Sequence, residues 1–404
     1  MRLTSGGQPV NRTKRRGRAV AVHLARLLRQ GHRVRHLPSN VIATTTKPTI
    51  VVTGISGNLG TRLLTLLDDF NVIGVDFATP QTDLPLRFEK IDLGRESACR
   101  QLVQILKESR ARAVVHLAFV IDQVRTGVLD VERMWQINVA GTARVMEAIT
   151  EVNRHDGEVD TFVFPSSVSA YGPETPGPVR ENHPLNGHTL PYAIHKREAD
   201  DVVRYRAESL GDCATYILRP HIFAGASMQN YLVGVLRGTP TGKSERASRM
   251  RIEGKRLPLL MPGRRVLESR IQLVHVDDVA RLLAYILRRP APGKNELTIL
   301  NVAGRGEPIT LGEAARIANA KIVNVRYRWL MRRILKFGWN IGLSAVPPEA
   351  LAYMVGSYTM DTTRLKQFLG KDYESVIKYT VTQALEDSLR ETFEKPITDA
   401  ARTS

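Results

Sequence analysis

Cysteine is scarce in this 404-residue chain, which contains only Cys99 and Cys213. The two residues form no metal-binding or redox motif, so we expect no metal site and a reducing, cytoplasmic compartment. Long apolar runs are also missing, because no stretch reaches the roughly 18 residues that a membrane-spanning helix needs. Hydrophobic content of 43% and charged content of 24% are typical of a soluble globular protein. A chain of this length usually folds into two domains.

Acidic residues are absent from the first 47 residues, which contain eleven of the chain's Lys and Arg residues. We interpret residues 1–46 as a basic, disordered extension. A targeting or membrane-surface segment and an over-long gene start are the alternatives. Neither a nucleic-acid motif nor aromatic interleaving accompanies the basic residues, so we expect no specific nucleic-acid partner.

The most informative stretch is KPTIVVTGISGNLG, residues 47–60. Its β-branched run predicts a buried parallel strand, and a helical pattern begins after the last glycine. Gly54 allows a sharp turn, Gly57 allows backbone N–H groups to approach a pyrophosphate, and Gly60 allows close packing of helix on strand. This order of strand, glycine turn and helix predicts a dinucleotide site. Within the turn, we expect cofactor contacts from Ser56, Asn58 and Leu59.

Further strands end at residues suited to the same cofactor. Asp76 closes the predicted strand 70–75, where a carboxylate can bind the adenosine ribose hydroxyls and repel a 2′-phosphate, which favours NAD over NADP. We also expect cofactor contacts at Asp92, Leu93, Leu117 and Ala118. Strands alternate with helical patterns, so the sequence predicts an α/β fold with a doubly wound parallel sheet.

Candidate catalytic residues follow the strand predicted at 161–165. Ser167 lies just after it, and Tyr192 and Lys196 lie four residues apart on one face of a predicted helix. A nearby ammonium would lower the tyrosine pKa towards neutrality, and the lysine can also hold the nicotinamide ribose. Ser167 would position a substrate oxygen beside the tyrosine hydroxyl for proton transfer coupled to hydride transfer.

These motifs together resemble the NAD-dependent epimerase/dehydratase family of the extended short-chain dehydrogenase/reductase superfamily. The resemblance covers about residues 48–389 and includes TGISGNLG, QINVAGT at 136–142, LRP at 218–220 and LVHVDDVA at 273–280. It implies a catalytic triad of Ser167, Tyr192 and Lys196, with Asn138 supporting the lysine through water. It also implies a contact between Pro220 and the cofactor, and a homodimer through the helices after Asn138 and around Tyr192.

The resemblance further implies a Rossmann domain with a smaller, discontinuous C-terminal substrate domain. We place the NAD-binding domain at 47–220 and 272–304. The substrate-binding domain then comprises 221–271 and 305–392, followed by a tail at 393–404.

Departures from the family pattern narrow the reaction. Family dehydratases carry Asp and Glu at the positions of Val168 and Ser169, so loss of water is disfavoured. Sugar-nucleotide enzymes usually have an asparagine where this chain has Ile222, and an arginine where it has Ile271. We expect Ser169, His221 and Arg270 to contact the substrate.

Two basic segments in the predicted substrate domain have alternative interpretations. Residues 237–270 carry ten Lys and Arg against three Asp and Glu; they form either a solvated loop or an anion-binding rim for a phosphorylated substrate. Residues 326–343 (RYRWLMRRILKFGWNIGL) predict a basic amphipathic helix. That helix either packs under a lid or contacts a membrane surface, which would make the protein peripheral.

The sequence therefore predicts an NAD-dependent enzyme that epimerises a nucleotide-activated sugar through transient oxidation of an alcohol. The alternative is an NAD(P)-dependent dehydrogenase or reductase of a bulky hydrophobic alcohol, of hydroxysteroid or flavonol type. A non-catalytic NAD-sensing protein is a third interpretation, which the intact triad disfavours.

Overall fold

The computed structural model describes residues 47–80, 86–121, 128, 130–155, 157–226, 228 and 230–390. The expected basic extension (1–46) and tail (393–404) lie outside these residues. Among the described residues, no helix combines the length and the apolar character needed to cross a membrane.

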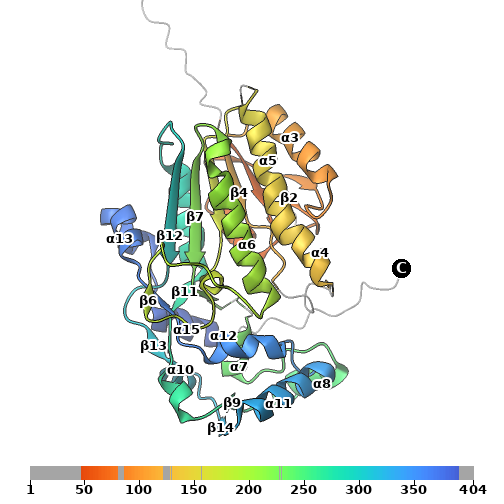
Figure 1. The fold of residues 1–404 in the computed structure, drawn as a ribbon, viewed down its shortest axis with the longest axis vertical. Helices are drawn as coiled ribbons and strands as arrows, with labels where there is room; N and C mark the ends of the chain where they lie inside the picture. Colours follow the sequence, from red (N-terminus) through yellow and green to blue (C-terminus); the bar gives the residue numbers. More distant parts are fainter. Residues whose placement is uncertain are drawn as a thin grey trace, which may run out of the picture. The chain divides into compact units, whose positions relative to one another are not determined.

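A seven-stranded parallel sheet forms the centre of the fold, in the order β12-β7-β5-β4-β1-β2-β3 (Figure 1). The strand order reverses between β1 and β4, which is where such sheets bind ligands. The doubly wound Rossmann sheet predicted from the sequence is confirmed. The strands are β1 (Thr49–Thr53), β2 (Asn71–Asp76), β3 (Arg87–Lys90), β4 (Ala113–His116), β5 (Thr161–Pro165), β7 (Ala214–Pro220) and β12 (Glu296–Val302).

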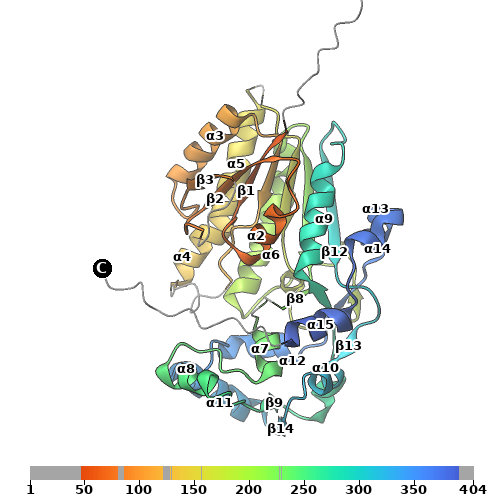
Figure 2. The ribbon, with the colours of Figure 1, turned by 180° about the vertical axis from the view of Figure 1, so that it is seen from behind.

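Helices cover both faces of the sheet (Figures 1 and 2). Each face of the sheet has its own hydrophobic core. Successive side chains of β1 point to opposite faces, so Ile50 and Val52 pack in one core and Val51 packs in the other. The first face is covered by α2 (Asn58–Leu64) and α9 (Val276–Arg288), and the second by α3 (Ser97–Ser109), α5 (Gly141–Asn153) and α6 (Pro191–Arg206).

A third hydrophobic core is assembled from segments that are far apart in the sequence. Leu236, Leu259, Ile271, Leu311 and Leu385 are among its buried members. Three pairs of short strands lie in or beside this core. They are β8 (Ile222–Ala224) with β11 (Leu273–His275), β9 (Leu259–Met261) with β14 (Ile322–Asn324), and β10 (Arg270–Ile271) with β13 (Ile309–Thr310). Its helices are α7 (Tyr231–Arg237), α10 (Leu311–Ile317) and α15 (Val381–Leu389).

Further short elements complete the C-terminal half. β15 (Thr359–Met360) pairs with β6 (Pro178–Val179). The remaining helices are α8 (Glu245–Ile252), α11 (Arg328–Asn340), α12 (Leu351–Val355), α13 (Thr363–Leu369) and α14 (Tyr373–Val376). In both ribbon views α8 and α11 lie side by side, well away from the central sheet (Figures 1 and 2).

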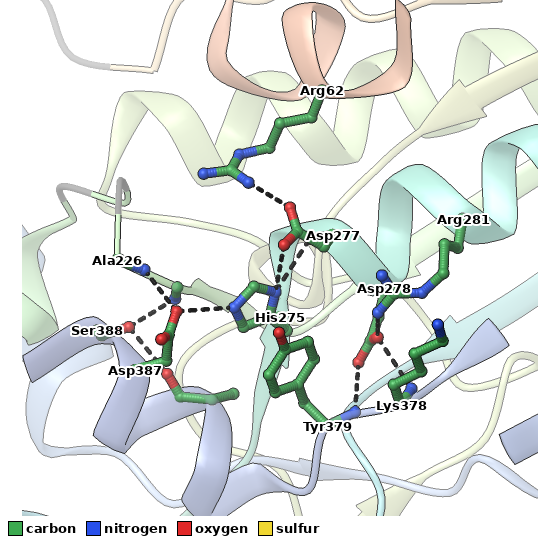
Figure 3. Close-up of polar contacts among 12 residues, drawn as sticks. Arg62, Ala226, His275, Asp277, Asp278, Arg281, Lys378, Tyr379, Asp387 and Ser388 are labelled. Carbon is green, nitrogen blue, oxygen red and sulfur yellow. Dashed lines mark hydrogen bonds and ion pairs between the residues drawn. The ribbon is translucent and has the colours of Figure 1, made fainter. Parts of the chain in front are cut away.

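A polar cluster at the start of α9 connects the helix of the glycine turn to the last helix (Figure 3). Arg62 of α2 forms an ion pair with Asp277, whose backbone N–H donates to Nδ1 of His275. The imidazole Nε2 of His275 lies 3.1 Å from Asp387 of α15, and that carboxylate also accepts from the backbone N–H of Ala226. The cluster therefore holds α15 and the loop after β8 against the Rossmann core.

Asp278 makes a second connection from the same helix. Its fully buried carboxylate accepts hydrogen bonds from the backbone N–H groups of Lys378 (2.9 Å) and Tyr379 (3.1 Å), and it forms an ion pair with Arg281. Because these backbone donors belong to the segment before α15, Asp278 fixes how that segment enters the fold.

We expect Asp278→Ala to lower the free energy of unfolding by about 2–4 kcal/mol, since two backbone donors and one guanidinium lose their buried acceptor. Asp277→Ala, the matched control, removes a part-exposed ion pair and should cost about 1 kcal/mol or less. Urea unfolding followed by circular dichroism measures both. Equal losses in the two variants would contradict the anchoring role of Asp278.

Candidate functional site

The glycine turn lies between the ends of three adjacent strands. Gly54 has φ +73°, and a Cβ there would come within 2.5 Å of the backbone nitrogen of Ala118. A residue with a side chain is therefore excluded by both conformation and contact with the end of β4. The predicted cofactor residues Leu117 and Ala118 thus lie directly against the turn. A side chain at Gly60 is likewise excluded, because its Cβ would clash with the backbone of Ile55.

Gly57 differs from its two neighbours in the motif. It is exposed, and a Cβ there would meet nothing nearer than the carbonyl oxygen of Gly54, at 3.2 Å. A side chain here would press on that carbonyl, although less closely than at Gly54 or Gly60. The missing side chain leaves the outer surface of the turn bare, so the phosphates of a dinucleotide can reach the backbone. In this respect the turn fits NAD.

Asp76, at the end of β2, is built into the turn. One carboxylate oxygen accepts from the backbone N–H of Ser56 at 2.9 Å, and the Ser56 hydroxyl donates to the carbonyl of Ala78 at 2.8 Å. The structure therefore brings Ser56 and Asp76 together, with the carboxylate next to the place where a ribose would follow the pyrophosphate. Asn58 is exposed on the turn, where its side-chain oxygen accepts from Arg62, and Leu59 packs partly against the core of the first face.

Asp92 and Leu93 are engaged inside the protein. The carboxylate of Asp92 accepts from the backbone N–H of Gly94 at 3.0 Å and forms an ion pair with Arg133, a residue of α4 (Val131–Trp135) that the sequence analysis did not identify. Leu93 is buried in the core of the second face. If the adenine of the cofactor binds at Asp92, it would contact a carboxylate that is already paired with Arg133.

The three proposed catalytic residues lie beyond the carboxyl end of β5. Ser167 caps a short 3-10 turn (Val168–Tyr171), and its Oγ accepts from the backbone N–H of Ser169 at 3.1 Å. Tyr192 and Lys196 come from the first two turns of α6. The Ser167 hydroxyl also bonds the Tyr192 side chain. Because Ser167 accepts from Ser169 and donates its hydroxyl proton to Tyr192, a substrate oxygen would take over that proton from Tyr192.

The amine of Lys196 lies in an aromatic pocket. It donates to the carbonyl of Pro165 at 2.7 Å and lies 3.6 Å from the ring centroid of Phe119 and 5.0 Å from that of Phe164. Burial lowers the pKa of Lys196 to about 7, and the negative charge of Asp200 only partly offsets this effect.

The structure gives the opposite direction to the expected lowering of the Tyr192 pKa by Lys196. Burial raises the pKa of Tyr192, and the hydrogen bond from Ser167 opposes that rise. Proton acceptance by Tyr192 therefore requires additional positive charge beside its hydroxyl.

Phe119 is a residue of the site that the sequence analysis missed. Besides facing Lys196, its ring makes an edge contact with Tyr192 at a centroid distance of 5.8 Å. Its position directly after Leu117 and Ala118 was the available signal, but nothing in the sequence showed that its ring would reach helix α6.

Asn138 lies in a π-helical turn (Gln136–Ala140) and is fully buried. Its amide oxygen accepts from the backbone N–H of Val120 at 2.7 Å, and its amide nitrogen donates to the Val120 carbonyl at 2.9 Å. The same nitrogen lies 3.4 Å from Nδ1 of His195. Asn138 therefore holds the segment that carries Phe119, and its side chain makes these contacts rather than a direct one to Lys196.

The three predicted substrate residues belong to different segments, namely the turn after β5, the junction of β7 and β8, and β10. Both ring nitrogens of the buried His221 are bonded within the protein, Nδ1 by the N–H of Ile222 at 2.9 Å and Nε2 to the carbonyl of Tyr358 at 3.0 Å. Burial also lowers the pKa of His221 to about 4, so the ring is neutral. These bonds give His221 a structural role, and its contact with the substrate stays a prediction.

Ser169 and Arg270 have different surroundings. Ser169 lies in the turn that follows Ser167, where its backbone orients the serine hydroxyl. Arg270 is exposed on β10 while Ile271 is buried, as expected for neighbouring residues of a strand. Pro220 is buried at the end of β7, opposite Val302 of β12.

Comparison with known proteins identifies the family. The sequence profile of the NAD dependent epimerase/dehydratase family matches residues 50–303. The chain belongs to this family. NAD is the family's cofactor, and the bare turn at Gly57 with the carboxylate of Asp76 fits it.

Curated relatives of the chain include two UDP-glucose 4-epimerases. The protein of Erwinia amylovora is 28% identical over 183 residues, which are 42% of this chain and 52% of that protein. The protein of Mus musculus is 26% identical over 174 residues, which are 38% of this chain and 48% of that protein. The chain thus spans about half the length of the curated relatives it matches.

Solved structures of the family share the fold. UDP-glucose 4-epimerase of Thermus thermophilus in complex with NAD gives a TM-score of 0.57 at 19% identity, covering 84% of this chain and 97% of the other. UDP-glucuronic acid 4-epimerase of Bacillus cereus with UDP-glucuronic acid and NAD gives 0.57 at 18% identity, covering 84% and 96%.

The low pKa of Lys196 predicts a specific dependence of stability on pH. Between pH 7 and the unfolded value near 10.4, the unfolded chain binds more protons at this residue than the folded chain does, so stability rises with pH. We expect Lys196→Met to remove this contribution, which has a slope of up to about 1.4 kcal/mol per pH unit. Urea unfolding of nucleotide-free wild type and variant across this range measures it. Parallel stability profiles would contradict the assignment.

Asp76 should control the choice between NAD and NADP. Asp76→Asn keeps an acceptor for the Ser56 N–H but removes the charge that repels a 2′-phosphate, so NADP should gain roughly tenfold relative to NAD. Asp76→Ala also loosens the turn and should weaken both cofactors. Calorimetric titration of each protein with both nucleotides measures the ratio. A wild type that already prefers NADP would rule out this role.

Proposed function

We propose that the chain is an NAD-dependent epimerase of a nucleotide-activated sugar. The observation that carries the proposal is the arrangement of Ser167, Tyr192 and Lys196 beyond β5, next to a glycine turn that fits NAD. The UDP-glucose 4-epimerases among the relatives, and the UDP-sugars bound in family structures, support the substrate class.

In the proposed reaction, the Tyr192 hydroxyl oxygen takes the proton of the substrate hydroxyl while Ser167 donates a hydrogen bond to the same substrate oxygen. When bound, NAD supplies a nicotinamide ring that accepts a hydride from the adjacent carbon and later returns it. Tyr192 then gives its proton back to the oxygen. If the hydride returns to the opposite face of the transient carbonyl carbon, the reaction is redox-neutral and changes only the configuration at that carbon.

Lys196, Val168 and Ser169 support this role. Lys196 would hold the nicotinamide ribose through its amine and, once protonated there, favour the Tyr192 phenolate. Val168 and Ser169 occupy the turn where the family's dehydratases carry acidic residues, and neither side chain can transfer protons for loss of water.

Two buried or half-buried isoleucines favour a second candidate, a dehydrogenase of a bulky hydrophobic alcohol. Ile222 is half-buried and Ile271 is 2% exposed, where sugar-nucleotide enzymes usually place asparagine and arginine. The protein would then release reduced cofactor. The expected homodimer through α5 and α6 is independent of this choice and stays a prediction.

The deciding experiment incubates purified full-length protein with UDP-glucose or UDP-galactose, without added NAD, after any bound nucleotide has been identified. Interconversion supports the epimerase. Accumulation of NADH only with a hydrophobic alcohol and added NAD would replace it with the dehydrogenase. Bound NAD with no turnover of either class would favour a cofactor-sensing protein.

We expect Tyr192→Phe to lower turnover by at least about 100-fold, because it removes the proton acceptor and changes little volume. NAD affinity should stay within a factor of roughly three, since the ring still packs on Phe119. Steady-state rates and calorimetric NAD titration test the two parts. Full activity in Tyr192→Phe would remove Tyr192 from the mechanism.

A further inference from the structure

Helix α11 carries an apolar stripe that the rest of the described chain covers only in part. Within α11, all of which is described, Met331 alone is buried. Phe337 is 65% exposed, whereas Leu330, Ile334 and Ile341 (just after the helix) are 38%, 39% and 36% exposed. These four residues are spaced by four, three and four positions, so they lie on one side of the helix. A continuous stripe of this kind is unusual on a soluble surface.

The surroundings of the stripe are strongly basic. Arg333 and Lys336 alternate with its members, and Arg328 and Arg332 lie on the same helix. No Asp or Glu occurs from residue 326 to residue 348. On neighbouring α8, Arg246 and Arg249 are also exposed, together with Glu245 at its start and Glu253 just after its end.

Aromatic side chains mix with these charges at the start of the helix. Tyr327 and Trp329 stack with a centroid distance of 6.2 Å, Arg326 lies 5.6 Å from the Tyr327 ring, and Arg333 lies 5.6 Å from the Trp329 ring. Trp329 is 59% exposed. Tyrosine, tryptophan and arginine with an apolar body and a polar end are favoured at the boundary between lipid and water.

The helix is held firmly even though its outer side is covered only in part. After its last turn, the carbonyls of Gly342 and Leu343 accept from the backbone N–H groups of Ser244 and Gly242, both at 3.0 Å. Gly342 has φ +64°, and Gly242 packs on its carbonyl so closely that a Cβ would clash. Backbone bonds to the loop before α8 therefore fix α11 with its stripe facing outwards.

We propose that α11 binds in the surface of an anionic phospholipid bilayer. Leu330, Ile334, Phe337 and Ile341 would enter the boundary between headgroups and acyl chains, while Arg333 and Lys336 bind lipid phosphates. Charge decides against a second copy of this chain on the same face, because two such surfaces would bring like charges together without any carboxylate of this segment between them. The helix lies on the bilayer and does not span it.

Vesicle sedimentation of the full chain tests the proposal without reference to catalysis. We expect binding to phosphatidylcholine vesicles that contain phosphatidylglycerol, and weak binding to phosphatidylcholine alone. Ile334→Ser/Phe337→Ser should lower the partition coefficient by about tenfold or more, because two apolar side chains leave the bilayer. The matched control, Val131→Ser/Tyr205→Ser, changes exposed apolar residues on α4 and α6 and should bind as the wild type does.

A charge-reversal pair tests the electrostatic part. Arg333→Glu/Lys336→Glu should abolish the preference for phosphatidylglycerol, whereas Arg100→Glu/Lys371→Glu makes the same change of net charge at exposed positions of α3 and the α13–α14 connection and should keep it. Circular dichroism checks that each variant is folded.

Three results would overturn the proposal. If both α11 variants bind vesicles as the wild type does, the vesicle binding belongs to another part of the chain, such as the basic first 46 residues. Equal binding to neutral and anionic vesicles would exclude charge complementarity. A wild-type dimer that Ile334→Ser/Phe337→Ser converts to monomer in sedimentation velocity without lipid would show that the stripe covers a second copy.

Discussion

Burial of the Lys196 amine is the interaction on which the proposed site depends. Its partners are the Pro165 carbonyl and the rings of Phe119 and Phe164, and burial lowers its pKa to about 7. An amine in such a pocket opposes folding, so packing elsewhere must compensate. Helix α6 supplies part of that packing. Its Asp200 is bonded to the buried Arg219 at 2.9 Å through both carboxylate oxygens, which fixes the helix on the sheet.

The parallel sheet brings the other parts of the site to that amine. Asp76, Gly54, Leu117 with Ala118, and Ser167 follow the ends of four consecutive strands, β2, β1, β4 and β5. Since parallel strands end at the same edge, residues more than a hundred positions apart share one surface. The cluster around His275 and Asp278 then fastens the last helices to this framework (Figure 3).

Sequence reasoning succeeded where chemistry follows local pattern. The β-branched run before Gly54 and the spacing of Tyr192 and Lys196 identified the turn and the helix, because glycine conformation and helical period act over a few residues. It failed where long-range packing decides. The partner of His221 is Tyr358, 137 residues away. Phe119 reaches Lys196 across the sheet edge. Burial of Tyr192 reversed the expected direction of its pKa shift. None of these depends on spacing along the chain.

Burial lowers the pKa of Lys196 to about 7, and we propose that contact of its amine with the nicotinamide ribose restores the proton when NAD binds. The most direct measurement is calorimetric titration of nucleotide-free Tyr192→Phe protein with NAD at about pH 8, in buffers of different ionisation enthalpy. The Tyr192→Phe background removes any proton released by the phenol. Our account predicts uptake of most of one proton, and none when Lys196→Met is added. Zero uptake with intact Lys196 would contradict it.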